Sequence, residues 1–183
     1  MKTPALILCG IALLILPCLA VDLTSATIPA TEPALPPSPS PSYIIDTPKV
    51  LSAAKFATLN TQLQQFERAT TNQFVVAIYD RLPPNVALDD YCQRLANAWG
   101  VGQKEKNNGI SFFVFVSDHK MRITLGTGLE TTITNDVCKR ILDNRVTPCL
   151  KAGDFDGGVQ ACVDALIEVA SHPPTTASAP GNH

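Results

Sequence analysis

The chain has 183 residues, 45% of them hydrophobic, and a formal net charge of −2. A chain of this length and composition is expected to hold one ordinary globular domain together with some accessory segments. The nearly balanced charge argues against a nucleic-acid-binding protein, which would carry a strong positive field, and against a strongly self-repelling chain.

The first twenty residues have the three parts of a secretory signal. Lys2 is the only charge, Ala5–Leu16 is an apolar run, and Ala20 is the small residue after which cleavage is expected. The run is shorter than the roughly 20 residues that span a bilayer. We therefore expect residues 1–20 to be a signal peptide and the mature protein to be periplasmic or secreted, with no membrane span after cleavage.

Two other interpretations of this segment stay open. If the apolar run continues to Val21 and is not cleaved, it becomes an anchor that tethers the protein to the membrane. Cys18 would be the modified residue of a lipoprotein signal, although Pro17 stands where such signals have a small residue.

The mature chain keeps four of the six cysteines, namely Cys92, Cys138, Cys149 and Cys162. An even number in an oxidising compartment permits disulfides, and we expect at least one, although the sequence does not choose among the pairings. Three of the four also fall at apolar positions of predicted helices, where core packing is the alternative. Zinc is not indicated, because no CxxC pair occurs and the three histidines are scattered.

Proline marks the segments that flank the domain. Residues 21–43 form a Pro-rich linker, with six prolines between Thr27 and Tyr43, and such a composition favours an extended spacer that buries nothing. Residues 171–183 are again rich in Pro, Thr, Ser and Gly without apolar periodicity, which predicts a disordered tail. The folded domain should therefore span residues 44–170.

The first half of the domain alternates helix and strand signals. Ser52 can cap a helix that runs to about Thr70, because apolar residues recur there at spacings of three and four. Gln73–Tyr79 is dense in β-branched and aromatic residues, which predicts a buried strand. Asp89 is expected to cap a second helix, which Gly100 would end.

The second half begins with a hairpin. Ile110–Val116 and Met121–Leu125 are apolar runs joined by a short polar segment, and they should pair antiparallel. The two longer strands are connected through a helix, so they should be parallel. Two more helices start near Thr134 and Asp154. The expected fold class is α/β, a small mixed β-sheet flanked by helices in the order α-β-α-β-β-α-α.

Three motifs follow one another along this domain. They are Trp99-Gly100-Val101-Gly102, then Lys104, Lys106 and Asn108-Gly109, and then Gly126–Glu130 with Asp136 opening the next helix. They resemble the W-x-x-G, K-x-K-D-N-G and G-Y-G-L-E patterns of the TPM-domain family, and the match runs in order from Tyr43 to Ala170. The resemblance implies an α/β fold, export to a lumen or periplasm, and a family with phosphatase members that includes a thylakoid-lumen protein and a photosystem II repair protein.

Strand directions predict where polar residues gather. The turn at Asn107 and Asn108 precedes one hairpin strand and the Gly126–Glu130 loop follows the other, so both should lie at one edge of the sheet. With Asp136 and Asp46 added, the site residues Asp46, Asn107, Asn108, Glu130 and Asp136 would form an oxygen-rich set that suits Ca²⁺ or Mg²⁺. Gly126 and Gly128 would allow a tight turn there.

Simpler interpretations of these residues stay open. Asp136 is also favourable as a first-turn carboxylate of a helix, Asn108-Gly109 as a plain turn, and Glu130 as a solvated loop residue. Asn107 stands where the family often has Asp, which removes a negative charge and weakens cation binding. Asp80 and Asp118 are expected at the opposite edge, at strand ends where open α/β sheets often bind ligands.

Two functions follow from this set. The first is a non-catalytic exported module that binds an envelope protein partner during assembly or repair, with a divalent cation that stabilises the loop edge. The alternative is a weak metal-assisted phosphatase acting on phosphomonoesters, in which the cation polarises a phosphoryl oxygen and Glu130 and Asp136 are ligands.

Overall fold

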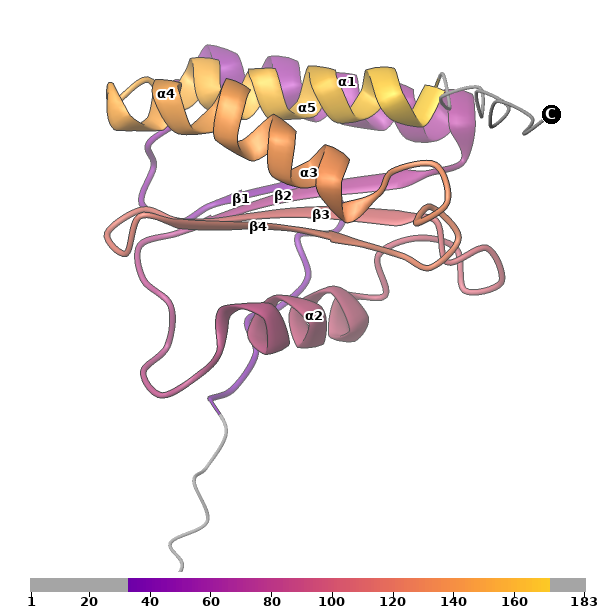
Figure 1. Cartoon of the computed structure of the whole chain (residues 1–183), viewed down its shortest axis with the longest axis horizontal. Coiled ribbons are helices and arrows are strands. Elements are labelled where there is room, and N and C mark those ends of the chain that lie inside the picture. The colour runs from indigo at the N-terminus through magenta and orange to yellow at the C-terminus, as the bar shows by residue number, and fades with distance from the viewer. Residues whose placement is uncertain (1–32, 172–183) are drawn as a thin grey trace, which may run out of the picture. The chain divides into compact units, whose positions relative to one another are not determined.

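The computed structural model describes residues 33–171, and they form three layers (Figure 1). A four-stranded sheet lies in the middle, α1, α3, α4 and α5 cover one face, and α2 covers the other. The predicted signal peptide, the linker up to residue 32 and the tail from His172 onward lie outside the described residues. No helix among residues 33–171 is long and apolar enough to cross a membrane.

The elements extend the predicted order. They are β1 (Ile44–Asp46), α1 (Ala53–Thr70), β2 (Gln73–Tyr79), α2 (Leu88–Trp99), β3 (Gly109–Phe115), β4 (Lys120–Leu125), α3 (Asn135–Ile141), a π-helical turn (Leu142–Val146), α4 (Thr147–Lys151) and α5 (Phe155–Ser171). The α/β class and the mixed sheet are confirmed. Three elements are additions to the predicted order: β1, the π-helical turn and α4.

The sheet has the order β1-β2-β3-β4, with the first three strands parallel and β4 antiparallel to β3. The predicted crossover and hairpin are therefore both confirmed. β2 and β3 start side by side, with Gln73 opposite Gly109, and β4 ends beside the start of β3, with Leu125 opposite Ile110. We call this end of the sheet the amino edge. The end where β1, β2 and β3 stop is the carboxyl edge.

Alternation along the strands divides the core between the two faces of the sheet. Phe74, Val76 and Ile78 of β2 point to the α1 side and are fully buried there with Leu59 and Leu63 of α1. Because successive side chains of a strand point to opposite faces, Ala77 and Tyr79 face the α2 side. Both faces are covered, which is why the strands read as continuous apolar runs rather than as alternating ones.

The α2 side has a smaller core of aromatic side chains. Phe113 and Phe115 of β3 pack there against Tyr91 and Leu95 of α2, all buried. The rings of Trp99 and Phe113 lie 5.8 Å apart between centroids, in a tilted arrangement that aromatic pairs favour. This face holds α2 against the sheet through few but large side chains.

The helix starts follow local capping, with one correction. The Ser52 hydroxyl accepts a hydrogen bond from Lys55 N at 3.2 Å, as predicted for α1. The predicted cap at Asp89 is wrong, because α2 begins at Leu88 and its N-cap is Ala87, two residues earlier, which makes no side-chain cap hydrogen bond. Asp89 lies in the first turn instead, where its carboxylate is 3.1 Å from Arg122 of β4.

The helical path from α3 to α4 changes its hydrogen-bond pattern next to a proline. Pro148 has no backbone N–H, so a regular α-helix through this point would lack one hydrogen bond. The chain makes a π-helical turn just before it, where Thr147 N–H bonds to Leu142 O, and the Thr147 hydroxyl donates to the same oxygen at 2.8 Å. The helix therefore continues to Lys151 with a change of phase.

All four cysteines among the described residues are free thiols, so the predicted disulfide is wrong for this part of the chain. Cys92 belongs to the core on the α2 side, whereas Cys138 and Cys162 belong to the core on the other face. The sheet separates Cys92 from them. Burial raises the pKa of the Cys92 thiol to about 12 and that of Cys138 to about 11. These three buried side chains therefore pack in the core, as the alternative interpretation had it.

The described part of the Pro-rich segment, Pro33–Tyr43, is not an inert spacer. Leu35 packs against the core on the α2 side, and the Trp99 indole N–H donates to Pro36 O at 2.8 Å. Farther along, Tyr43 N–H donates to the side chain of Asn60 in α1 at 2.8 Å. The segment thus ties the α2 layer to the α1 layer, and the prediction that it buries nothing is wrong here.

The indole hydrogen bond gives a first test. Trp99→Phe keeps an aromatic ring against Phe113 but removes the donor to Pro36 O, so we expect the free energy of unfolding to fall by about 1 kcal/mol. Limited proteolysis within Pro33–Tyr43 should become faster. Urea unfolding and timed digestion measure the two effects, with Asn97→Ala on the exposed side of α2 as control. Equal digestion of the Trp99→Phe protein and the wild type would contradict this role.

Candidate functional site

Asn108 holds the amino edge together. Its side chain is 4% exposed, and its Oδ1 accepts a hydrogen bond from Gln103 N at 2.8 Å. Its Nδ2 donates to Thr71 O at 2.8 Å and to Asn72 Oδ1 at 3.1 Å. The amide therefore joins the turn before β3 to the turn between α1 and β2. Both its donor group and its oxygen are hydrogen-bonded to neighbouring loop atoms, so Asn108 has a structural role here, and its role as a cation ligand stays a prediction.

Two glycines let the loop after β4 lie directly on the turn before β3. A Cβ added at Gly126 would overlap the carbonyl group of Asn107, and one at Gly128 would overlap the carbonyl oxygen of Lys106. Gly128 N–H donates to Asn107 O at 3.0 Å across this contact. The glycines are thus required for close approach of two backbones, in addition to any freedom to turn.

Three of the predicted site residues are exposed at or near this edge. Asn107 adopts a left-handed conformation with φ 46°, and its backbone N–H donates to Gln103 O at 2.8 Å, while its side chain is exposed. Glu130 and Asp136 are also exposed, and neither carboxylate is bonded to another of the residues 33–171. Asp136 lies in the first turn of α3, which is consistent with the helix-dipole interpretation.

Asp46 does not belong to this set. It ends β1, which runs parallel to β2 with Asp46 opposite Ile78, so it lies at the carboxyl edge. Its carboxylate accepts hydrogen bonds from Val50 N at 3.1 Å and Leu51 N at 2.9 Å and so shapes the loop that leads into α1. Within the described chain, no group of three or more His, Cys, Asp or Glu side chains is placed to hold a metal ion. The five predicted residues therefore do not form one cluster.

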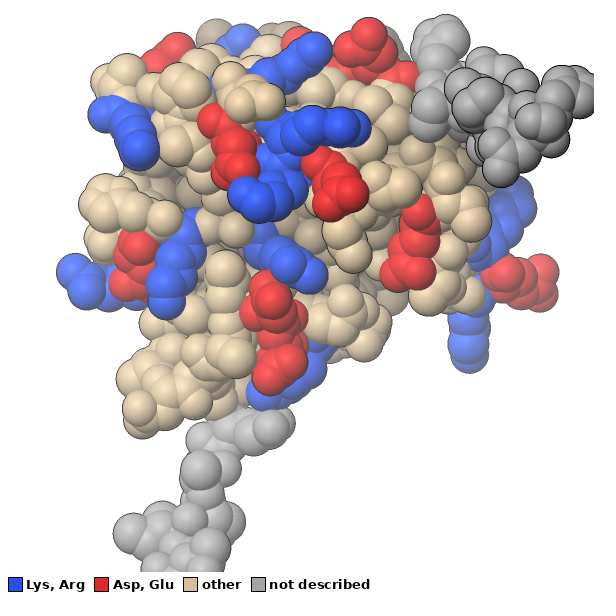
Figure 2. All heavy atoms as spheres, viewed as in Figure 1, with Lys and Arg blue, Asp and Glu red and all other residues tan. Residues whose placement is uncertain are grey.

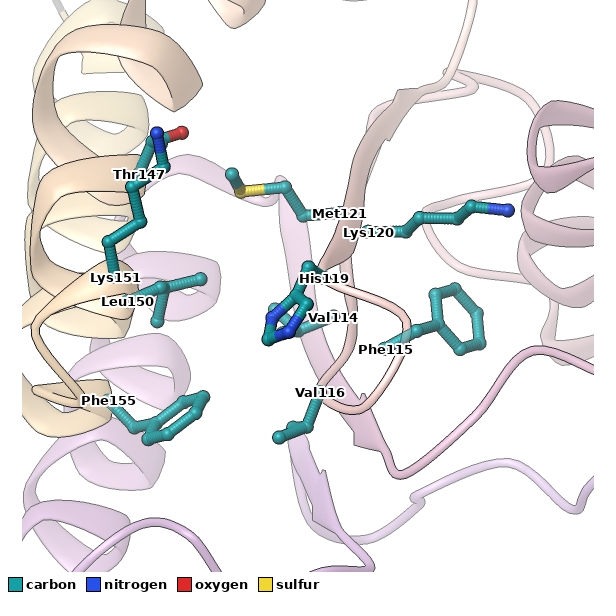
Figure 3. Close-up of a pocket in the computed structure, with 10 residues that line it drawn as sticks. All are labelled: Val114, Phe115, Val116, His119, Lys120, Met121, Thr147, Leu150, Lys151 and Phe155. Atoms are coloured by element: carbon teal, nitrogen blue, oxygen red, sulfur yellow. The ribbon is translucent and has the colours of Figure 1, made fainter.

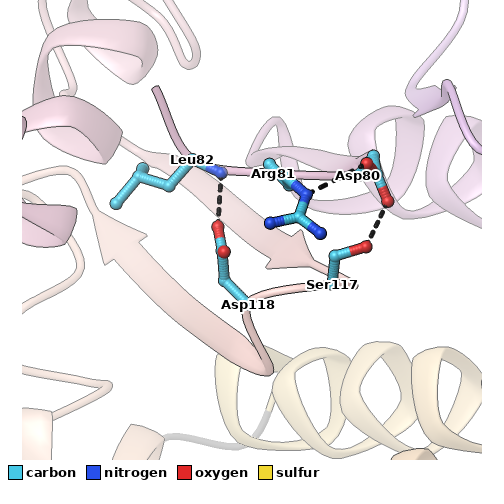
Figure 4. Close-up of polar contacts among 5 residues, drawn as sticks. All are labelled: Asp80, Arg81, Leu82, Ser117 and Asp118. Atoms are coloured by element: carbon cyan, nitrogen blue, oxygen red, sulfur yellow. Dashed lines mark hydrogen bonds and ion pairs between the residues drawn. The ribbon is translucent and has the colours of Figure 1, made fainter. Parts of the chain in front are cut away.

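Asp80 and Asp118 lie at the carboxyl edge, as predicted, and both bind neighbouring loop atoms (Figure 4). Ser117 Oγ donates to Asp80 Oδ1 at 2.5 Å, and Arg81 approaches the other Asp80 oxygen at 3.7 Å. Leu82 N–H donates to Asp118 Oδ2 at 2.6 Å. These contacts fasten the segment after β2 to the β3–β4 turn. They give both aspartates a structural role.

A cavity of about 440 Å³, which we call the carboxyl-edge pocket, opens between the β3–β4 turn and helices α4 and α5 (Figure 3). The residues that line it include Val116, His119, Met121, Leu150, Lys151 and Phe155. This pocket was not predicted from the sequence. The sequence signal that could have indicated it is a set of apolar residues at the ends of helices and strands. These residues do not fall at the periodic positions that face the core.

The charges on the surface are mixed. Figure 2 shows acidic and basic side chains interspersed on the face that it presents, and no large field of one sign covers that face. This distribution agrees with the absence of a nucleic-acid-binding signal in the composition.

Comparison with known proteins identifies the domain. The family model of the TPM domain matches residues 44–169. Among solved structures, the N-terminal domain of a protein from P. gingivalis is 26% identical, with a TM-score of 0.65, over 71% of this chain and 83% of that chain. No curated protein matches the chain.

Two further solved structures are similar at 15% identity, which shows the fold alone. The BA42 protein from Bizionia argentinensis has a TM-score of 0.59 over 69% of this chain and 85% of its own. The N-terminal domain of the cg2496 protein from Corynebacterium glutamicum has a TM-score of 0.56 over 82% of this chain and 93% of its own. Both likenesses support the same three-layer arrangement.

The buried amide of Asn108 provides a test of the amino edge. Asn108→Ala leaves Thr71 O and Gln103 N without their partners, and we expect the free energy of unfolding to fall by about 2–3 kcal/mol. Asn107→Gly is the matched control, since its side chain is exposed and glycine accepts a positive φ; its effect should stay within about 0.5 kcal/mol. Chemical denaturation of both variants measures the difference. Equal losses of stability in the two variants would contradict this role of the Asn108 side chain.

Proposed function

The chain belongs to the TPM domain family, and from this membership and the geometry of its loops we propose that it is a non-catalytic, exported module that binds a partner protein. The binding surface is the amino edge of the sheet. It consists of two loops, Gln103–Asn107 and Gly126–Glu130.

The observation that carries this proposal is the way the two loops are held. Asn108 is buried beneath them with three hydrogen bonds, and Gly126 brings their backbones into direct contact. The side chains of Gln103 to Asn107 are nevertheless exposed. A surface that is already ordered before binding loses little conformational entropy when a partner arrives, so a rigid, exposed polar edge suits protein recognition.

Export and the kind of partner rest on the sequence. The segment Lys2–Ala20 has the charge, apolar run and small final residue of a secretory signal. An exported domain of this family would meet proteins of the cell envelope, and the family resemblance suggests a role during their assembly or repair. The mixed charges of the Gln103–Asn107 loop, with Glu105 between Lys104 and Lys106, favour a partner surface with both signs.

The proposal includes a cation site with fewer ligand residues than the sequence predicted. Without Asp46 and Asn108, the predicted donors are the carboxylates of Glu130 and Asp136 and the amide of Asn107. Calcium tolerates irregular coordination geometry with water among its ligands, whereas magnesium binds through one or two carboxylates and several waters but demands a nearly ideal octahedron. A bound Ca²⁺ would neutralise the two carboxylates and hold the loop to the start of α3. The affinity expected for few, exposed ligands is in the millimolar range, about 1 mM.

A thermal shift tests the cation. At 10 mM Ca²⁺, about ten times the expected dissociation constant, the melting temperature should rise by about 5 °C. Glu130→Ala combined with Asp136→Ala should abolish the rise, because it removes both carboxylates. Asp143→Ala combined with Glu168→Ala removes the same charge from exposed sites elsewhere and should leave the rise intact. If calcium does not raise the melting temperature of the wild type, the cation has no place in the function.

A turnover assay separates the binding module from the alternative phosphatase. We expect no hydrolysis of p-nitrophenyl phosphate above background, with or without Ca²⁺ or Mg²⁺, because the amino edge offers no paired acid and base. The Glu130→Ala and Asp136→Ala double variant supplies the background for a folded protein. Turnover that the wild type shows and this variant lacks would replace the binding module by a metal-assisted phosphatase.

A further inference from the structure

The carboxyl-edge pocket has apolar walls that the fold leaves uncovered. Val116 and Met121 form the wall on the side of the sheet, and Leu150 and Phe155 form the wall on the side of the helices (Figure 3). All four pack against the core but are only partly buried, so each presents apolar surface to the hollow. A concave, mostly apolar site of about 440 Å³ is within the range of small-molecule sites.

The charges that border the pocket are all basic. His119, Lys120 and Lys151 line it, and no Asp or Glu does, in a chain whose overall charge is −2. Figure 3 shows Lys120 extending away from the helices, to the face of the sheet that Phe115 occupies, whereas the imidazole of His119 lies on the pocket side and Lys151 extends along the helix toward Thr147. Two cationic or proton-donating groups therefore stand at the apolar walls.

The acidic residues next to the lining are committed elsewhere. Asp118 precedes His119 in the chain, but its carboxylate accepts a hydrogen bond from Leu82 N at 2.6 Å (Figure 4). Asp154 precedes Phe155 and accepts from Gly157 N at 2.8 Å, as the cap of α5. The basic groups at the pocket are thus not paired with these neighbours, and an anion from outside could interact with them.

His119 is held over the pocket by a strained turn. Its φ is 52°, in the left-handed region that costs a residue other than glycine roughly 1–2 kcal/mol, and its N–H donates to Val116 O at 3.2 Å. Glycine or asparagine would form the same turn at lower cost. Strained residues of this kind are concentrated at ligand sites, where the strain aims a side chain.

We propose that the carboxyl-edge pocket binds an anionic amphiphile with one apolar chain, of the class of medium-chain carboxylates. The chain lies between Val116 and Met121 on one side and Leu150 and Phe155 on the other. The anionic head lies at the mouth, beside Lys151 and His119. This site is at the opposite end of the sheet from the proposed partner-binding loops, so either proposal can fail without the other.

A series of carboxylates tests the fit of the chain. Titration calorimetry of the full domain should show one saturable site for decanoate, with affinity rising about fourfold for each methylene from hexanoate to decanoate. The gain should stop once the cavity is full, with a plateau in the longer members. Decyltrimethylammonium, which has the same chain and the opposite charge, should bind at least about tenfold more weakly. Equal affinity for the two head groups would overturn the proposal.

Matched variants test the head group. Lys151→Gln and His119→Asn should each weaken decanoate about threefold to fivefold, because each removes one exposed charged or proton-donating partner. Asparagine tolerates the left-handed turn, so the second variant should keep the fold. Arg68→Gln removes the same charge from an exposed residue in the last turn of α1, outside the lining of the pocket, and should leave the affinity unaltered. If Arg68→Gln weakens binding as much as Lys151→Gln, surface charge explains the binding and the pocket does not.

Two further outcomes are decisive. NMR shifts of the Met121 methyl group on adding decanoate would support the proposed seat of the chain, and shifts confined to the α2 face would refute it. A peptide that ends in leucine with a free carboxylate also combines an apolar side chain with an anionic group. If that peptide binds more tightly than decanoate, the pocket is a site for a polypeptide end, and the amphiphile is ruled out.

Discussion

The common direction of β1, β2 and β3 decides which parts of this chain can meet. Parallel strands collect all their starts at one edge of the sheet and all their ends at the other. Asn108 and the loop after β4 are therefore together at the amino edge, whereas Asp46, Asp80 and Asp118 are together at the carboxyl edge. No side-chain motion can bring members of these two groups into one site, since a buried sheet lies between them. The residues of any one proposed site therefore have to come from the same edge of the sheet.

The two edges are built by different means. At the amino edge, backbones touch directly at Gly126 and Gly128, where a Cβ would overlap the facing backbone, and Asn108 joins two turns by three hydrogen bonds. Such packing leaves few alternative conformations. At the carboxyl edge, side-chain hydrogen bonds such as those of Asp80 and Asp118 fasten the turns, and partly buried apolar side chains remain between sheet and helices. The first edge is closed by backbones in contact, whereas the second leaves an apolar pocket beside its turns.

The elements predicted correctly are those in which apolar residues recur regularly or form a continuous run. The element β1, which depends on pairing with a neighbouring strand, was not predicted. The two long strands, the hairpin and α1 follow from runs or repeats of apolar residues, and the structure confirms them. β1 is three residues long, and only its pairing with β2 makes it a strand, so no local signal distinguishes Ile44–Asp46 from a loop. Because β1 was not predicted, Asp46 was expected at the wrong edge. The strand β1 runs parallel to β2, so its last residue, Asp46, lies at the carboxyl edge. Asn108 was placed at the correct edge, but its burial depends on Thr71 and Asn72, which sequence spacing does not connect to it.

The pocket was not predicted from the sequence for a similar reason, which concerns the phase of the helical period. The helical period of 3.6 residues identifies Cys138 and Ile141 as core residues of α3, and both are buried. The π-helical turn before Pro148 then inserts one extra residue, which rotates everything after it by about 100° relative to an unbroken helix. Leu150 and Thr147 face the pocket only because of that rotation, and a reading that keeps the original phase places them elsewhere. The π-helical turn next to this proline thus determines which side chains of α4 form a wall of the pocket.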